Sequence, residues 1–268
     1  MTLTDLQVRE AADALIEAER TGRQIGLLSL RHPDLDMEGA YAIQDTLISQ
    51  KLDAGRKKIG WKIGLTSKAM QQALGIDIPD SGVLLDDMLF ANGAEIPAGR
   101  FIQPRIEAEI AFVMKAPLAG DHITRDDVRT ATDHVTAAIE VLDTRILRQD
   151  PESGTPRKIV DTIADNAANA GIIRSETYHD IDAFDLRWIG AIVKRNGEVE
   201  ETGLGAGVLN DPIEGIVWLA RRMRQYGQTI EPGQVILAGS FIRPIECPPG
   251  TEIEADFGPF GRVTCQFA

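Results

Sequence analysis

The spacing of apolar residues changes near Gly60, and this change constrains the kind of fold that the chain can form. Before it, apolar residues recur at helical spacing over 4–22 and 36–55, which predicts two amphipathic helices. After it, the apolar segments are short and are separated by Gly and Pro, as between β-strands. We therefore predict an α+β fold, with a helical region over 1–75 and a mostly β region over 76–268 that together form one integrated domain.

The region after Gly60 also predicts individual elements. Asn196-Gly197 supplies the positive φ angles of a type I′ turn, so 186–194 and 198–202 are predicted to pair as a hairpin. Arg105 to Phe112 alternates between polar and apolar residues, as a half-buried strand does. A further strand is predicted over 134–145, and helices are predicted over 68–74, after Thr124, and from Asp211 to Tyr226.

Composition excludes several classes of protein. With 28 Lys and Arg against 41 Asp and Glu, the net charge is −13, which disfavours nucleic acid as a partner. The two cysteines, Cys247 and Cys265, are too few for a disulfide framework. The charged N-terminus lacks the apolar core of a signal peptide, and no apolar run approaches the ~18 residues of a membrane span. We expect a cytoplasmic protein.

Two glutamates on the strand over 105–112 indicate a metal site. Residues two apart share a face of a strand, so Glu107 and Glu109 point the same way while the residues between them face the core. Glu140 interrupts another apolar strand, where a charge is costly without a partner. Three such carboxylates suit Mg²⁺ or Mn²⁺, which prefer oxygen ligands. The alternative is a solvated face, with Glu140 paired to Arg105 or Arg145.

Gly60 to Ser67 places a lysine in an unusual position. Lys62 lies between glycines and beside Trp61, and a lysine desolvated near a metal has a depressed pKa that suits proton transfer. The alternative is a surface lysine. Thr66 and Ser67 either donate hydrogen bonds to a substrate carboxylate or cap the helix that follows.

Three other segments contain candidate residues. Asp80 is predicted to lie at the tip of a turn over 79–82, since Asp is common in turns. A polar run over 156–169 contains Lys158 and Asn166. Small residues before Ser240 would let a ligand approach the backbone. Phosphate-binding glycine motifs, a G-x-S-x-G elbow and an H-E-x-x-H pair are all missing from the sequence, which argues against nucleotide binding, serine hydrolysis and zinc proteolysis.

Several segments, taken in order, resemble one family over nearly the whole chain. They include GWKIGLTSKAM, PRIEAEIAFV, IEVLDTRI, PRKIVDTIADNAANAG and ILAGSFIRP. The chain is similar to the hydratase/decarboxylase family of the fumarylacetoacetase-like superfamily, whose members act in the breakdown of aromatic acids. The stretch over 150–158 resembles the branch that hydrates 2-oxo-hept-4-ene-1,7-dioate.

The resemblance implies a fold, a cofactor and roles for the residues above. The fold is a mixed β-roll with an N-terminal helical region, and the assembly is a homo-oligomer, typically a decamer. The cofactor is Mg²⁺ or Mn²⁺. The implied metal ligands are Glu107, Glu109 and Glu140, the implied catalytic residues are Lys62 and Asp80, and the implied substrate-binding residues are Thr66, Ser67, Lys158, Asn166 and Ser240. One position departs from close relatives, which carry His where this chain has Trp61.

The implied activity is metal-dependent addition of water to an unsaturated 2-oxo dicarboxylate. The distal carboxylate of such a substrate needs a positive partner, and Arg157 or Lys158 are candidates on charge alone. The alternatives are decarboxylation of a 2-oxo-enedioate, hydration of 2-oxopent-4-enoate and hydrolysis of an acylpyruvate. A non-catalytic partner subunit of a decarboxylase is a further alternative.

Overall fold

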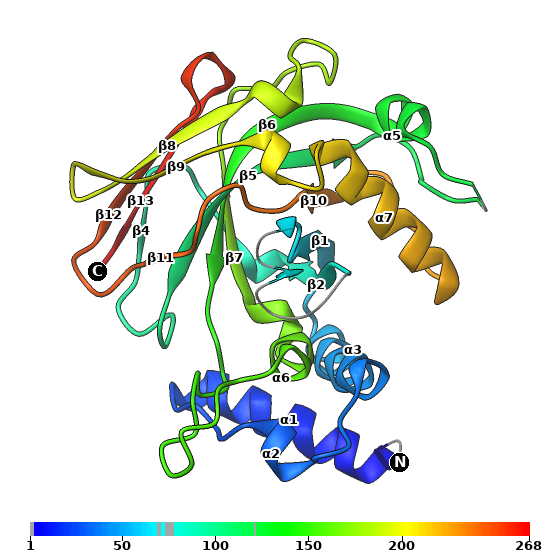
Figure 1. The fold of residues 1–268 in the computed structure, drawn as a ribbon, viewed down its shortest axis with the longest axis vertical. Coiled ribbons are helices and arrows are strands. Elements are labelled where there is room, and N and C mark those ends of the chain that lie inside the picture. Colours follow the sequence, from blue (N-terminus) through cyan, green and yellow to red (C-terminus); the bar gives the residue numbers. More distant parts are fainter. Residues whose placement is uncertain (1–2, 69–70, 73–77, 121) are drawn as a thin grey trace.

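A layer of helices lies beneath a curled β body in the computed structural model, which describes residues 3–68, 71–72, 78–120 and 122–268 (Figure 1). The two predicted N-terminal helices are confirmed, and the first begins with the capping box of Thr4 and Gln7. The helices are α1 (Asp5–Thr21), α2 (Leu28–Arg31), α3 (Met37–Asp53), α5 (Arg125–Ala131), α6 (Ile159–Ala164) and α7 (Pro212–Gln225).

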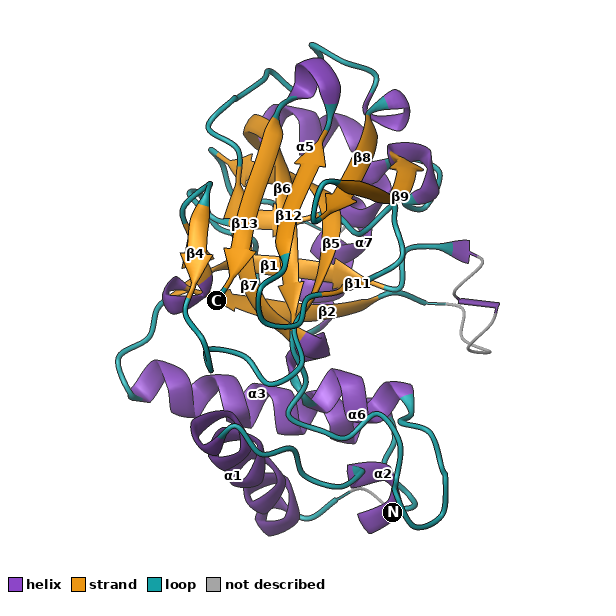
Figure 2. Cartoon of the chain, turned by 90° about the vertical axis from the view of Figure 1, so that its left-hand side faces the viewer, coloured by secondary structure: helices purple, strands orange, loops and turns teal. Residues whose placement is uncertain are grey.

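The β body consists of two sheets in the described part of the chain. The eight-stranded sheet has the order β2 (Asp80–Leu85), β1 (Lys58–Gly64), β10 (Val235–Leu237), β5 (Arg105–Met114), β6 (Thr132–Leu142), β7 (Asn169–Arg174), β3 (Leu89–Phe90), with β11 (Ile245–Glu246) also paired to β5. The five-stranded sheet has the order β4 (Ala94–Ile96), β13 (Arg262–Phe267), β12 (Glu252–Asp256), β8 (Gly190–Arg195), β9 (Glu198–Leu204) and lies in front of it in Figure 2. Since β1 pairs parallel to β10 and antiparallel to β2, the mixed β-roll is confirmed.

The two faces of the eight-stranded sheet have different partners. One face carries Ile106, Ile110 and Phe112 into a large buried cluster that also contains Phe260 and Val263. The opposite face, on which strand alternation puts Glu107 and Glu109, forms a small separate apolar cluster. That cluster contains Leu84, Ala111, Ala138, Ile172, Val235 and Leu237. The candidate carboxylates therefore lie beside a second, smaller core.

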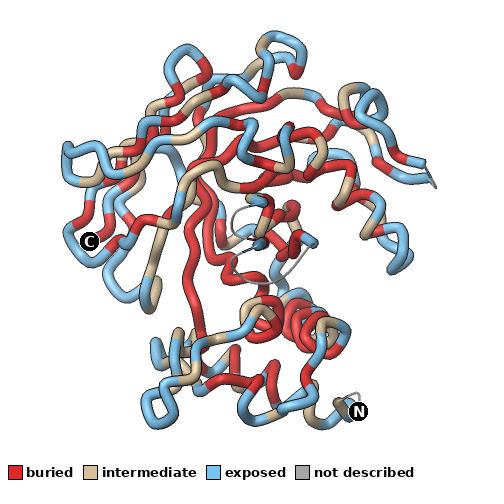
Figure 3. The backbone as a smooth tube through the Cα atoms, in the orientation of Figure 1, coloured by how far each residue is buried: buried red, intermediate tan, exposed pale blue. Residues whose placement is uncertain are grey.

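Buried polar contacts hold the helical layer together and attach it to the sheet. Asp161 on α6 accepts hydrogen bonds from the backbone and hydroxyl of Ser29 at 2.8 and 2.7 Å. Gln44 on α3 donates to the Ser81 carbonyl at the start of β2. Figure 3 shows the continuous buried backbone where α3 and α6 meet the strands. The division at residue 75 stays a prediction, and β1, which lies before it, pairs with two strands that lie after it.

A polar seam joins β2 to β7 and closes the roll. The Asn166 side chain accepts from Val83 N at 2.7 Å and donates to Val83 O at 2.9 Å, so it pairs as a neighbouring strand would. Asn169 also donates to Val83 O, at 3.1 Å. Residues 166–168 have φ angles of 51°, 52° and 59°, a left-handed conformation that is costly outside glycine. The contacts with Val83 hold the chain in this conformation.

The predicted hairpin and the helix from Asp211 are confirmed, with corrections at their boundaries. Asn196 and Gly197 have φ angles of 53° and 82°, as the predicted type I′ turn requires. The first hairpin strand begins at Gly190, not at 186, because Asp185 accepts from the Arg187 backbone and Leu186–Trp188 forms a 3₁₀ turn.

Other predicted boundaries also differ. The strand predicted over 134–145 runs from Thr132 to Leu142, and the buried Asp143 carboxylate then accepts backbone hydrogen bonds from 102 and 103. The helix predicted over 68–74 lies largely outside the described residues. Among the described helices, none is long and apolar enough to cross a membrane.

Gly60 provides a test of how closely the strands of the roll pack. It lies opposite Val235, and a Cβ atom at Gly60 would lie 1.8 Å from the Val235 carbonyl oxygen. Because backbone must move to relieve this overlap, we expect Gly60→Ala to lower the free energy of unfolding by about 3 kcal/mol or more. Chemical denaturation measures the change. Gly26→Ala is the control, since nothing lies within 4 Å there, and equal stability of the two variants would contradict the close packing.

Candidate metal centre and active site

Three glutamates converge on the concave face of the eight-stranded sheet. Glu107 on β5 lies directly opposite Glu140 on β6, and Glu109 follows two residues along β5 on the same face. One carboxylate oxygen from each lies within 4.8 Å of the others. Glu109 and Glu140 are completely buried, and Glu107 is partly exposed. The predicted convergence is confirmed, and the alternative of a solvated face is wrong.

The oxygens of this cluster have few partners. Glu109 Oε2 accepts from the Gly239 backbone N–H at 2.8 Å. Glu109 Oε1 and both oxygens of Glu140 are buried without a hydrogen-bond partner among the described residues. Buried polar atoms without partners are costly, and a hard cation that accepts several oxygen ligands would satisfy all three. The donor set therefore fits a divalent cation.

Burial raises the pKa of each glutamate, and repulsion by neighbouring carboxylates adds to it. Burial is the largest cause for all three, and it raises the pKa of Glu140 to about 8 despite the attraction of Lys62. The pKa of Glu109 is raised well above its usual value by burial and by Glu140. Burial also raises the pKa of Glu107. Since a metal binds the charged form, it competes with protons for these oxygens.

Lys62 and Asp80 meet beside the carboxylate cluster. Lys62 is 3% exposed, and its Nζ lies 3.5 Å from Glu140 Oε1. A Cβ atom at Gly64 would lie 2.9 Å from Lys62 Nζ and 2.2 Å from Asp80 Oδ1, so this glycine leaves the space in which the two groups approach. Asp80 Oδ1 has no hydrogen-bond partner among the described residues. The predicted loop tip is wrong, because Asp80 is buried and begins β2 opposite Gly64.

Burial and the nearby carboxylates act on the pKa of Lys62 in opposite directions. Burial lowers the pKa of Lys62, but Glu140, Asp80 and the other two glutamates outweigh burial and raise it. The carboxylates by themselves therefore keep Lys62 charged. The depressed pKa predicted beside a bound metal stays a prediction, and the surface-lysine alternative is wrong because Lys62 is buried. A lysine in this environment is a charged donor that can hold a negative oxygen or deliver a proton.

Arg145 and Trp61 both have their partners away from the carboxylate cluster. Arg145 pairs with Asp165 at 2.5 Å, so it does not serve Glu140. Trp61 faces the large core and donates to Gln234 Oε1 at 3.1 Å. Its substitution for His therefore leaves the carboxylate face unchanged. Arg105, the other partner suggested for Glu140, lies on the face of Glu107 because of strand alternation.

The three predicted hydroxyl residues differ in their burial and in their contacts. Thr66 is buried against Gly239, where a Cβ would lie 2.3 Å from its hydroxyl, and so lies next to the amide that contacts Glu109. Ser67 is half-buried. Ser240 donates to the Ile242 carbonyl at 2.9 Å. Substrate contacts by these residues stay predictions.

Asn166 and Lys158 also stay predictions as substrate contacts. Both ends of the Asn166 amide already bond to Val83, which gives this residue a positioning role at the seam. The Lys158 side chain is exposed, and its backbone N–H donates to Asp161 at the start of α6.

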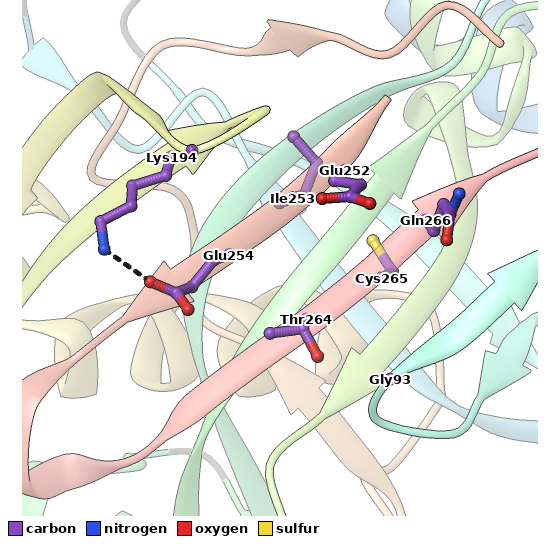
Figure 4. A pocket seen from close by; sticks show the side chains of 9 residues that line it. Gly93, Lys194, Glu252, Ile253, Glu254, Thr264, Cys265 and Gln266 are labelled. Carbon is purple, nitrogen blue, oxygen red and sulfur yellow. Dashed lines mark hydrogen bonds and ion pairs between the residues drawn. The ribbon is translucent and has the colours of Figure 1, made fainter. Parts of the chain in front are cut away.

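A separate hollow of about 390 Å³ lies on the outer face of the five-stranded sheet (Figure 4). It is lined by residues of β8, β12 and β13, and Lys194 pairs there with Glu254 at 2.8 Å. The only group of three metal-ligating side chains in the described part of the chain is Glu107, Glu109 and Glu140. The glutamate cluster, and not this hollow, is therefore the candidate site.

Comparison with solved structures identifies the class of fold. The structure is similar to 4-oxalocrotonate decarboxylase from Pseudomonas putida G7 complexed with magnesium and adipate, with a TM-score of 0.93 and 32% identity over 100% of this chain and 99% of that chain. Fumarylpyruvate hydrolase from Pseudomonas aeruginosa has a TM-score of 0.59 at 13% identity, over 78% and 88% of the two chains, and shows the fold alone. The fold is that of the fumarylacetoacetase-like enzymes.

Sequence comparison narrows this class. No protein-family model matches the chain. The 2-oxo-hept-4-ene-1,7-dioate hydratase of Escherichia coli is 48% identical over 256 residues, which are 96% of each chain. The chain belongs to the hydratase/decarboxylase family of the fumarylacetoacetase-like superfamily.

The carboxylate cluster predicts a metal-dependent change in stability. We expect Mn²⁺ at about 100 times its dissociation constant to raise the melting temperature by roughly 5 °C or more, because it binds only the folded protein. Glu109→Gln should abolish this increase and should not destabilise the metal-free protein, since it removes one of three repelling carboxylates. Differential scanning fluorimetry measures both effects.

Glu254→Gln is the matched control for that experiment. Glu254 is an acidic residue on the outer sheet face, paired with Lys194, and its replacement should leave the response to Mn²⁺ unchanged. An Mn²⁺ response that survives in Glu109→Gln would contradict the assignment of the centre.

Proposed function

We propose that this chain is a divalent-metal-dependent hydratase that converts 2-oxo-hept-4-ene-1,7-dioate to 4-hydroxy-2-oxoheptanedioate. The observation that carries the proposal is the convergence of three glutamates with Lys62 and Asp80 on one face of the roll. The name and 48% identity of the Escherichia coli relative support the reaction and the substrate. The chain is then a hydro-lyase of aromatic catabolism.

The proposed metal ligands are Glu107, Glu109 and Glu140, and the proposed ion is Mg²⁺ or Mn²⁺. When bound, such an ion would act as a Lewis acid that draws electrons from the 2-oxo acid group of the substrate. Support comes from the buried oxygens without partners and from the magnesium named with the related decarboxylase. Both ions prefer octahedral oxygen coordination, so the same residues serve either.

The proposed proton transfers belong to Lys62 and Asp80. Net hydration of the 4-ene adds a hydroxyl group at C4 and a proton at C5 of the substrate. If the double bond first moves into conjugation with the 2-oxo group, C3 loses a proton and C5 gains one, and C3 is protonated again after water has added at C4. One group must therefore receive protons from C3 and from water while another delivers them. Burial raises the pKa of Asp80, which makes this carboxyl a better proton acceptor than an exposed aspartate. Lys62 stays charged among the carboxylates and is placed to hold the negative charge that develops on the 2-oxygen.

The proposed substrate contacts are the hydroxyl groups near the cluster. Thr66 lies against Gly239, and Ser67 and Ser240 are partly accessible at the ends of their segments. Hydroxyl groups can donate to a carboxylate without adding charge to an acidic site. Lys158 would contact the substrate from the loop before α6, and Asn166 would contact it from the seam between β2 and β7.

Decarboxylation is the second candidate function. The similarity that favours it is the TM-score of 0.93 to a 4-oxalocrotonate decarboxylase. Both reactions place negative charge on the same 2-oxygen, so the same residues would serve. The products distinguish them, since only decarboxylation releases CO₂. Turnover by the isolated chain would also exclude a purely non-catalytic partner role.

We expect purified protein to consume 2-hydroxyhepta-2,4-dienedioate in the presence of Mg²⁺ without releasing CO₂. Loss of the conjugated-diene absorbance and CO₂ release would be followed together. Glu107→Ala should abolish the metal-dependent turnover while keeping the fold, because it removes one of three converging ligands. Full activity of that variant would contradict the ligand assignment, and CO₂ release would move the function to decarboxylation.

We also propose that the chain acts as a homo-oligomer in the cytoplasm. The support is an apolar face formed by β8, β9 and the 3₁₀ turn before β8, where Trp188 is 73% exposed, Ile192 is 47% exposed and Leu204 is 45% exposed. Such gatherings of exposed apolar side chains are typical of protein interfaces. The two buried free cysteines suit a reducing compartment.

For a decamer, light scattering should give a mass of 10 × 29.2 kDa, or 292 kDa. Trp188→Ser should reduce this mass if the apolar face is an interface, because the exposed indole is lost. A mass of 29.2 kDa for the unaltered protein would contradict oligomerisation.

A further inference from the structure

An arginine whose guanidinium has no hydrogen-bonded partner among the described residues lies next to the carboxylate cluster. Arg105 begins β5 two residues before Glu107, so the two side chains share a face with Cα atoms about 7 Å apart. Arg105 is half-buried, and its guanidinium forms no hydrogen bond or ion pair with any residue that the structure describes, although the charges of Glu246, Glu107 and Asp143 act on it from a greater distance. A half-buried guanidinium normally has carboxylate or carbonyl partners, so this one is available for a ligand.

The loop between β6 and α6 brings a second arginine to the same place. Its two arms pair at Gln149 and Pro156, and the Arg157 N–H donates to the Arg148 carbonyl at 2.9 Å. Arg148 is anchored to Glu246 by bonds of 2.6 and 2.9 Å. Glu246 on β11 lies directly opposite Arg105 in the sheet register. The anchor therefore fixes the loop, and Arg157 with it, beside the start of β5.

The charges of these arginines are unequally compensated. Arg148 is neutralised by Glu246, whereas the one side-chain hydrogen bond of Arg157 among the described residues reaches the Ile146 carbonyl at 3.4 Å. Burial lowers the pKa of Arg157, and repulsion by Arg105 lowers it further, while Asp165 opposes both. Burial and then Arg148 lower the pKa of Arg105, while the charges of nearby carboxylates, Glu246 first, oppose them. Guanidinium groups stay charged even so, which leaves two adjacent positive charges without a carboxylate bonded to them.

These two positive charges would offset the repulsion that the second carboxylate of a dicarboxylate would meet at this acidic site. Three glutamates and Asp80 crowd the concave face, and the chain has a net charge of −13. A substrate carboxylate that is not at the metal would be repelled by these groups. Arginine binds carboxylates through two parallel hydrogen bonds, and it does so best where water is partly excluded.

We propose that Arg105 and Arg157 bind the distal carboxylate of the substrate and so make the site selective for 2-oxo dicarboxylates over 2-oxo monocarboxylates. The inference deepens the proposed function and rests on it, since it assumes that the 2-oxo acid end of the substrate lies at Glu107, Glu109 and Glu140. Of the two cations that the sequence suggested, Arg157 is half-buried and close enough to Arg105 and Arg148 to be repelled by them, whereas Lys158 is exposed. The structure indicates Arg105 as a second partner of the distal carboxylate, which the sequence did not suggest.

Two saturated ligands of equal length test this selectivity without turnover. 2-Oxoheptanedioate and 2-oxoheptanoate differ only in the distal carboxylate, and neither can be hydrated. Calorimetric titration in the presence of Mg²⁺ should show tighter binding of the diacid by roughly 10-fold or more, as expected when a charge-assisted pair of hydrogen bonds is gained. Arg157→Met and Arg105→Met should each weaken the diacid by about 10-fold and leave the monoacid nearly unchanged.

The control removes a cation elsewhere. Arg262→Met on β13 takes away a positive charge from the outer sheet face, where Arg262 lies near Glu254 and Asp256, and should leave the ratio of the two affinities unchanged. Because Arg105 lies near the proposed ligand Glu107 and lowers its pKa, the Mn²⁺ affinity of Arg105→Met is measured as well, so that weaker binding of the diacid is not confused with weaker binding of the metal. Arg157→Met, which is not adjacent to a proposed ligand, tests the inference even if Arg105→Met fails to fold.

Each outcome separates the inference from the proposed function. Equal affinity for the two ligands in the unaltered protein, or equal weakening of both in Arg157→Met, would overturn the inference. If the dienedioate is still hydrated under those results, the proposed function stands. If neither ligand binds and no turnover occurs although Mn²⁺ binds, both the proposed function and the inference are wrong.

Discussion

Repulsion among three converging carboxylates, two of them completely buried, is the interaction on which the rest of the structure depends. Glu107, Glu109 and Glu140 bring like charges together where water is largely excluded, and burial alone would make this arrangement unstable. Lys62 offsets part of the charge, and a divalent cation would offset more. The stability that the two cores provide is therefore partly spent on holding a site that is unfavourable by itself.

The remaining architecture positions these groups. Antiparallel register places Glu107 opposite Glu140, and the parallel pair of β1 with β10 carries Lys62 to the same face. The seam between β2 and β7, made by Asn166 and Val83, closes the roll so that side chains from both edges of the sheet meet inside it. The helical layer holds β2 from outside, through Gln44 on α3. Each layer thus constrains a strand that contributes to the site.

Glycine has a direct part in the chemistry because it lets charged groups approach one another. Gly64 leaves the space in which Lys62 and Asp80 meet, and Gly239 presents its N–H to Glu109 while Thr66 packs against it. A side chain at either position would separate groups that must be close. The site is consequently built from backbone as much as from side chains.

Local pattern was sufficient for much of this protein. Period-two alternation determined that Glu107 and Glu109 share a face, and capping and turn residues determined α1, α7 and the hairpin at Asn196, because these effects act within a few residues. Only tertiary structure decided that Asp80 is buried, that the pKa of Lys62 rises, and that Arg157 approaches Arg105. Those properties depend on burial and on charges from segments far apart in the chain, and such distances exist only after the roll has closed.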